Sequence, residues 1–114
     1  MPAYILVLYK KPANPPAFYK YYYENHVPLV HQIPGLKSFN VTAAPPVALS
    51  GDAPYLIAQL EFDSMADLQA GMGSPEGQAT AADVPNFASG PTVLVYETRP
   101  AAWNTYFAGS GGPE

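Results

Sequence analysis

The feature of this sequence that most constrains its fold is an apolar run near the N-terminus, from Tyr4 to Tyr9. Pro2 precedes the run and Lys10-Lys11-Pro12 follows it, and its aromatic and β-branched side chains predict a strand. Successive residues of a strand point to opposite faces of the sheet, so both faces of this strand are apolar. The fold must therefore cover the sheet on both sides.

A helix is expected next, beginning at Asn14. Asn14 is a favourable N-cap residue, and the two prolines after it suit a first helical turn. Phe18, Tyr22 and His26 then recur at every fourth position, which predicts one aromatic stripe. Pro28 cannot donate a backbone hydrogen bond to the preceding turn, so the helix is expected to kink or restart there.

The remaining elements complete a known order. Alternating apolar residues predict strands over residues 36–44, 55–62 and 92–99, and helical spacing predicts helices over residues 65–72 and 76–84. The order strand, helix, strand, strand, helix, strand is the split βαβ pattern of the ferredoxin-like fold. We therefore expect an α+β protein with a four-stranded antiparallel sheet and helices on one face.

Two helices leave the second face of such a sheet bare. The first strand is apolar on that face, and the third strand is expected to place Tyr55 and Ile57 there. The most economical cover is a second copy of the chain, so we expect a homodimer. Residues 1–99 form the expected domain and residues 100–114 a glycine-rich tail. The aromatic side chains of the tail either reach across the partner or fold back on their own subunit: Trp103, Tyr106 and Phe107.

Composition narrows the class of protein. With 48% hydrophobic and 12% charged residues, the chain can build one core and one domain. The net charge is −4 and Lys10-Lys11 is the only basic cluster, so no nucleic acid partner is expected. Cysteine is absent, which excludes thiolate chemistry. The first apolar run is far shorter than the roughly 20 residues of a membrane span and follows no basic region, so we expect no membrane association and a cytoplasmic protein.

The sequence contains few motifs that indicate a chemical function, and His26 is the best candidate for a catalytic residue. The sequence lacks the signatures of dinucleotide binding, phosphate binding and hydrolases. His26 and His31 lie about 140° apart around a helix without a third ligand at a recognisable spacing, so no metal site is expected. Burial on the stripe would lower the pKa of His26 below about 6.5 and leave a neutral base. The alternative is a half-buried structural histidine, hydrogen-bonded to a loop or to the C-terminal helix.

One part of the chain resembles the EthD family. The run from Tyr22 to Val30 contains His-x-Pro-Leu, and Pro-Gly-Leu follows at residues 34–36, in the order and spacing found in that family. The similarity continues at residues 55–62, 74–77 and 82–87, and spans residues 3–99. The resemblance implies a dimeric α+β barrel in which His26 and Asp83 face one cleft. Asp83 would then orient the imidazole or serve a proton relay.

These observations lead to three functional hypotheses. The first is a cofactor-independent enzyme, similar to a monooxygenase, isomerase or lyase, that acts on a hydrophobic or aromatic oxygenated compound in degradation or secondary metabolism. His26 would be its acid–base group. The second is a non-catalytic binding or stress-response module, and the third a haem-binding barrel with His26 as axial ligand. The expected substrate-binding side chains are Phe18, Tyr22, Tyr23, Tyr55 and Ile57.

Overall fold

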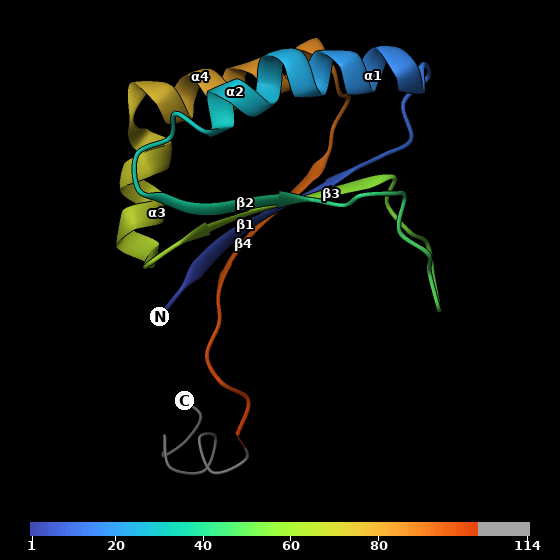
Figure 1. Ribbon diagram of the computed structural model, residues 1–114. Coiled ribbons are helices and arrows are strands. Elements are labelled where there is room, and N and C mark those ends of the chain that lie inside the picture. Colours follow the sequence, from blue (N-terminus) through green and yellow to red (C-terminus); the bar gives the residue numbers. More distant parts are fainter. Residues whose placement is uncertain (103–114) are drawn as a thin grey trace.

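The computed structural model describes residues 1–102 and has one four-stranded antiparallel sheet with helices on one face (Figure 1). The strand order is β2-β3-β1-β4, so the two central strands come from the first and second βαβ halves of the chain. This order is that of the ferredoxin-like fold, which confirms the predicted α+β class and topology. The strands are β1 (Ala3–Tyr9), β2 (Leu36–Val41), β3 (Leu56–Phe62) and β4 (Thr92–Glu97).

The helices form a layer over one face of this sheet (Figure 1). Figure 1 shows α1, α2 and α4 above the strands, with α3 standing at one end of the sheet. Within residues 1–102, no helix has the length and apolar character that a membrane crossing needs. The helical segments are α1 (Pro15–Tyr21), the π turn η1 (Tyr22–His26), α2 (Val27–Val30), α3 (Met65–Gly73), α4 (Pro75–Asp83) and the short 3-10 turn η2 (Val84–Asn86).

The first helix passes Pro28 by widening into a π turn. The Asn14 side chain caps the helix by accepting a hydrogen bond from the backbone N–H of Ala17 at 3.2 Å, as the sequence predicts. A kink or restart was expected at Pro28, and a new helix, α2, does begin there: the backbone N–H of Val27 donates to the carbonyl of Tyr22, which closes the π turn. His26 is the last residue of this π turn, a feature that is frequent at functional sites.

Three of the four strands are shorter than the sequence pattern predicts. β2 ends at Val41 and β4 at Glu97, although the backbone of Thr42 still bonds to Ile57 and that of Thr98 to Pro2. β3 begins one residue later than expected, after Tyr55.

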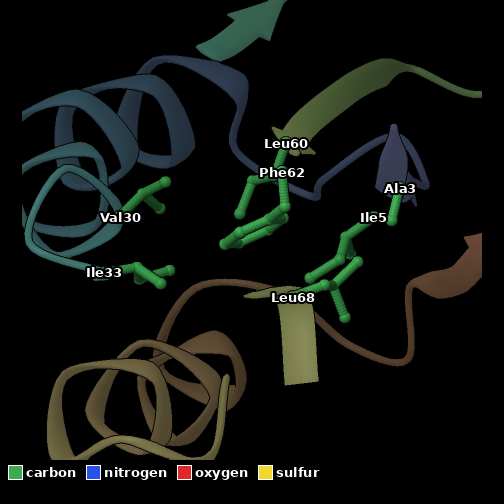
Figure 2. Close-up of a cluster of buried hydrophobic side chains, with 7 residues drawn as sticks. All are labelled: Ala3, Ile5, Val30, Ile33, Leu60, Phe62 and Leu68. Atoms are coloured by element: carbon green, nitrogen blue, oxygen red, sulfur yellow. The ribbon is translucent and has the colours of Figure 1, made fainter. Parts of the chain in front are cut away.

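The core lies between the helix layer and the two central strands. Figure 2 shows one cluster, in which side chains of β1 and β3 meet those of α2, α3 and the loop after α2. Gly77 brings α4 close to α3, since a Cβ at this position would collide with the backbone of Gly71 and Met72. This close packing positions α4, and with it Asp83, over the sheet. The cluster consists of Ala3, Ile5, Val30, Ile33, Leu60, Phe62 and Leu68.

Within residues 1–102, no helix covers the second face of the sheet (Figure 1). The rings of Tyr4 and Tyr96 stack there, with centroids 5.4 Å apart. Leu94 lies beside them on β4 and remains 46% exposed. The helices therefore cover one face, as predicted. The expected aromatic side chains of the tail, Trp103, Tyr106 and Phe107, lie outside the described residues.

Candidate functional site

A cavity of 690 Å³ lies between the helix layer and the sheet. Its floor is formed by residues of β1, β2, β3 and β4, and its roof by η1, α2, α4 and the segment that joins α4 to β4. Most of the lining is aliphatic. The polar side chains on its walls are those of Tyr9, Tyr22, His26, Thr80 and Ser89. Such an apolar cavity with few polar groups is typical of a small-molecule site.

His26 lines this cavity, and Asp83 contacts the imidazole from behind, outside the cavity lining. The Nδ1 atom of His26 lies 3.0 Å from Oδ2 of Asp83. Both residues are buried, with 4% and 9% of their surface exposed. His26 belongs to η1, and Asp83 is the last residue of α4. Their contact therefore links the first helical segment to α4 above the sheet.

Asp83 is held by two further hydrogen bonds. The hydroxyl of Tyr21 donates to Oδ1 at 2.7 Å, and the Nδ2 of Asn86 donates to the same oxygen at 3.0 Å. Oδ1 is thus occupied by the protein, which directs Oδ2 to the imidazole. The carboxylate is fixed from both sides and has little freedom to rotate away from His26.

Electrostatics favour an ionised Asp83 beside a neutral His26. Burial raises the pKa of Asp83, but hydrogen bonds from Asn86, Tyr21 and His26 outweigh it and hold the pKa below the usual value for aspartate. Burial lowers the pKa of His26 below 6.5, and the Asp83 carboxylate offsets this effect only in part. Near pH 7 the imidazole is therefore neutral.

The hydrogen bond to Asp83 also fixes the tautomer of His26. A carboxylate can only accept, so Nδ1 carries the proton that it receives. Nε2 then carries the free lone pair. Among the residues that the structure describes, Asp83 is the hydrogen-bond partner of this ring, so Nε2 remains available to a molecule in the cavity.

Tyr22 adds a hydroxyl group at the same wall. Its side chain is fully buried, and within residues 1–102 its hydroxyl has no hydrogen bond of good geometry, although the hydroxyl of Tyr9 lies close enough to contribute to its raised pKa. Its ring lies 5.5 Å from that of His26, and burial raises its pKa, so the phenol stays protonated. A buried hydroxyl without a partner is costly unless a ligand or water satisfies it. The hydroxyl of Tyr22 is therefore an unsatisfied donor behind the cavity wall, which a ligand would reach only if the side chains around it move.

The other expected substrate-binding residues lie outside the cavity wall. Phe18 is buried behind Tyr22, with the two rings stacked at 5.8 Å. Tyr23 is 50% exposed. Tyr55 was expected on the second face of the sheet, but its ring lies 6.0 Å from that of Tyr19, because β3 begins only at Leu56 and strand alternation does not apply to Tyr55. Ile57 does lie on the second face, away from the cavity.

Three side chains of the site were not anticipated from the sequence: Tyr21, Asn86 and Phe87. Tyr21 and Asn86 hold Asp83, and the ring of Phe87 packs 4.7 Å from that of His26. Asn86 follows Asp83 by three residues, a spacing that allows a local hydrogen bond. In the described part of the chain, no group of three or more histidine, cysteine, aspartate or glutamate side chains is arranged to hold a metal ion.

Comparison with known proteins identifies a family and a relative that this chain resembles over most of its length. The model of the EthD domain family matches residues 10–91. A protein of Rhodococcus erythropolis, described as an uncharacterized 11.0 kDa protein in the thcB-thcC intergenic region, is 45% identical over 94 residues, covering 81% of this chain and 89% of the relative.

Solved structures show the same similarity. A structure described as an ethyl tert-butyl ether d (ethd) family protein from Bacillus halodurans has a TM-score of 0.78 and 30% identity, covering 87% of this chain and all of that one (100%). A protein from Thermobifida fusca, described as a dimeric ferredoxin-like protein of unknown function, has a TM-score of 0.62 and 13% identity, over 85% of this chain and 90% of that one. The latter likeness concerns the fold alone.

Proposed function

Since this chain belongs to the EthD family, we propose that it is a cofactor-independent enzyme that moves a proton on a small hydrophobic or aromatic oxygenated molecule. The observation that carries the proposal is that His26 lines a 690 Å³ apolar cavity while its Nδ1 lies 3.0 Å from the carboxylate of Asp83 behind it. A buried imidazole that is neutral at pH 7 and is oriented by a carboxylate is a common arrangement for enzymatic proton transfer.

His26 acts as the general base in this proposal. Its Nε2 takes a proton from a carbon or oxygen atom of the substrate, and the positive charge that forms on the imidazole is stabilised by Asp83. The proton is returned at a different atom or to a leaving group, which covers isomerase-like and lyase-like outcomes. An oxygenase-like outcome would also need dioxygen as a co-substrate, which would accept electrons from the deprotonated substrate, leave one oxygen atom on it and release the other as water.

Tyr22 stabilises the negative charge that develops on the substrate. Its buried hydroxyl has no hydrogen bond of good geometry in the described chain and can donate to a carbonyl or phenolate oxygen once the side chains around it move. The substrate is therefore expected to carry an oxygen acceptor close to the proton that His26 removes. The apolar walls hold the remainder of the molecule and exclude water from the base.

The test is a deuterium exchange experiment on a panel of aryl ketones and phenols, followed by proton NMR. The wild type should accelerate exchange of a carbon-bound proton in at least one compound, and His26→Ala should lose about 100-fold or more of that rate. His31→Ala is the matched control, because His31 is exposed and outside the cavity. Equal rates in the wild type and His26→Ala would refute the role of His26.

A non-catalytic binding module is the second candidate, favoured by the same unsatisfied hydroxyl of Tyr22. It predicts tight binding of a compound from the panel without exchange in any of them, and an affinity that depends on Tyr22 but not on His26. Haem is the third candidate and has less support. Within residues 1–102, the cavity that His26 lines contains no lysine or arginine for the propionates, and Lys10 and Lys11 line a neighbouring pocket instead.

We also propose that the enzyme is a cytoplasmic homodimer. Solved structures with this fold are described as dimeric. The uncovered sheet face, with Leu94 at 46% exposure, offers a self-complementary apolar surface. Native mass spectrometry should give a dimer that Leu94→Asp converts to monomer, while Leu49→Asp, in an exposed loop, leaves it unchanged. A wild-type monomer would contradict the dimer. The absence of cysteine fits a reducing compartment.

A further inference from the structure

A second, polar pocket adjoins the cavity on the far side of Phe87. It has a volume of 330 Å³ and is lined by the segment after β1, which contributes Lys10 and Lys11, and by residues 85–89. The two pockets share part of their lining, namely Tyr9, Pro85, Ala88, Ser89 and Pro91. A molecule that extends from the cavity past this shared wall would place its end beside the two lysines.

The lysines of this pocket differ from the other lysines of the chain in their surroundings. Lys20 pairs with Glu24 at 3.6 Å and Lys37 pairs with Asp63 at 3.3 Å. Within residues 1–102, neither Lys10 nor Lys11 forms an ion pair. In a chain with a net charge of −4, two adjacent lysines without carboxylate partners can accommodate an anion without breaking an existing ion pair.

The negative charge of Asp83 also favours an anion near the lysines rather than near His26. Asp83 is ionised and lies behind His26, so an anionic group next to the imidazole would be repelled. Phe87 packs against the imidazole and also lines the second pocket, so an aromatic ring lies between the two regions. An asymmetric molecule would therefore be oriented with its acidic end toward the lysines and its neutral, reacting end toward Nε2.

We propose that the pocket of Lys10 and Lys11 binds an oxyanion of the substrate, so that the substrate class is a hydrophobic or aromatic acid with a carboxylate or similar group remote from the reacting atom. The part of this proposal that places the reacting atom next to His26 rests on the proposed function. The anion site itself is a statement about binding and is tested without turnover.

The test compares two fluorescent probes that differ by one charge, anilinonaphthalene sulfonate and neutral phenylnaphthylamine. Their affinities are measured by titration of the wild type and of the double variant Lys10→Gln/Lys11→Gln. The matched control is Lys20→Gln/Lys37→Gln, which removes the same charge elsewhere on the surface. The double variant at the pocket should lose about tenfold in sulfonate affinity, keep its affinity for the neutral probe, and show a weaker salt dependence.

Ser89→Trp shows where the probes bind. Ser89 is exposed and belongs to the wall that the two pockets share, so an indole there should weaken both probes. Sulfonate binding that is equal in the two double variants, or unaffected by Ser89→Trp, would overturn the anion site while leaving the role of His26 untouched. Conversely, loss of exchange activity in His26→Ala with equal sulfonate binding in the two double variants would support the proposed function alone.

Discussion

His26 Nδ1 and Asp83 Oδ2 lie 3.0 Å apart although 57 positions separate the two residues in the sequence. The contact exists because η1 and the end of α4 lie side by side over the sheet, where both residues are buried. A buried aspartate with three hydrogen-bond donors holds its charge, and the neutral imidazole beside it keeps a free lone pair at Nε2. This pairing provides the base for the proposed chemistry.

Replacing Asp83 by Asn should impair the base without removing it. The substitution takes away the carboxylate that raises the pKa of His26 and stabilises its charged form, and it allows the other tautomer. The deuterium exchange rate is expected to fall about 100-fold or more. Asp67→Asn makes the same chemical change at an exposed position of α3 and should leave the rate unchanged. Equal rates for the two variants would show that Asp83 has no part in proton transfer.

Tyr21 is expected to act through Asp83. Tyr21→Phe removes the 2.7 Å hydrogen bond to Oδ1, so the pKa of Asp83 should rise and the exchange rate should fall severalfold. Carbon NMR of the Asp83 carboxyl group measures the first effect directly. Tyr23→Phe serves as the control, since Tyr23 is half exposed and lies outside the cavity wall. An unchanged Asp83 pKa in Tyr21→Phe would contradict this role.

The close packing of α3 and α4 makes a prediction about stability. Gly77→Ala places a Cβ against the backbone of Gly71 and Met72, which cannot move without separating the two helices. We expect a loss of about 1–3 kcal/mol in the free energy of unfolding, measured by urea denaturation. Gly73→Ala, four residues earlier, has open space around the new Cβ and should cost far less. A neutral Gly77→Ala would mean that α4 sits farther from α3 than described.

Much of the fold was predictable, because it depends on local patterns. Proline and glycine boundaries and apolar alternation located all four strands, and the Phe18–Tyr22–His26 stripe located the helix that carries the base. The prediction was wrong for the face of the sheet on which Tyr55 lies, which depends on the residue at which β3 begins. Tyr55 follows the alternation of β3 in the sequence but precedes the strand, so its ring turns to α1. Ile57 obeys the alternation, which places it on the face opposite the cavity.

The site itself was only partly accessible from sequence. Asp83 came from the resemblance to the EthD family, since no spacing rule links it to His26. Tyr21 and Asn86 were missed because their role depends on how α4 docks beside the first helix, which is a long-range property. Tyr21 is adjacent to the predicted stripe rather than on it, and no periodicity would have selected it.

Resistance to acid should depend on the same pair. Burial lowers the pKa of His26 in the folded protein, so below about pH 6.5 the unfolded chain binds more protons than the folded one. The free energy of unfolding should therefore decrease as the pH falls from about 6.5 to the lowered pKa, and again below about 3.8, where Asp83 contributes in the same way. Urea denaturation at a series of pH values measures both decreases in the free energy of unfolding. His26→Gln should remove the decrease that begins near pH 6.5, and the control His31→Gln should keep it. Identical pH curves for the two variants would show that His26 does not cause this decrease.

The proposed proton transfer depends on the protonation state of His26, and nitrogen NMR of the imidazole at pH 7 measures that state directly. We predict a neutral ring with the proton on Nδ1 and a bare Nε2, a pKa below 6.5 on titration, and a change in the Nε2 signal when a ligand enters the cavity. An imidazolium at pH 7, or a proton on Nε2, would contradict a His26 that is poised to accept a proton from a substrate.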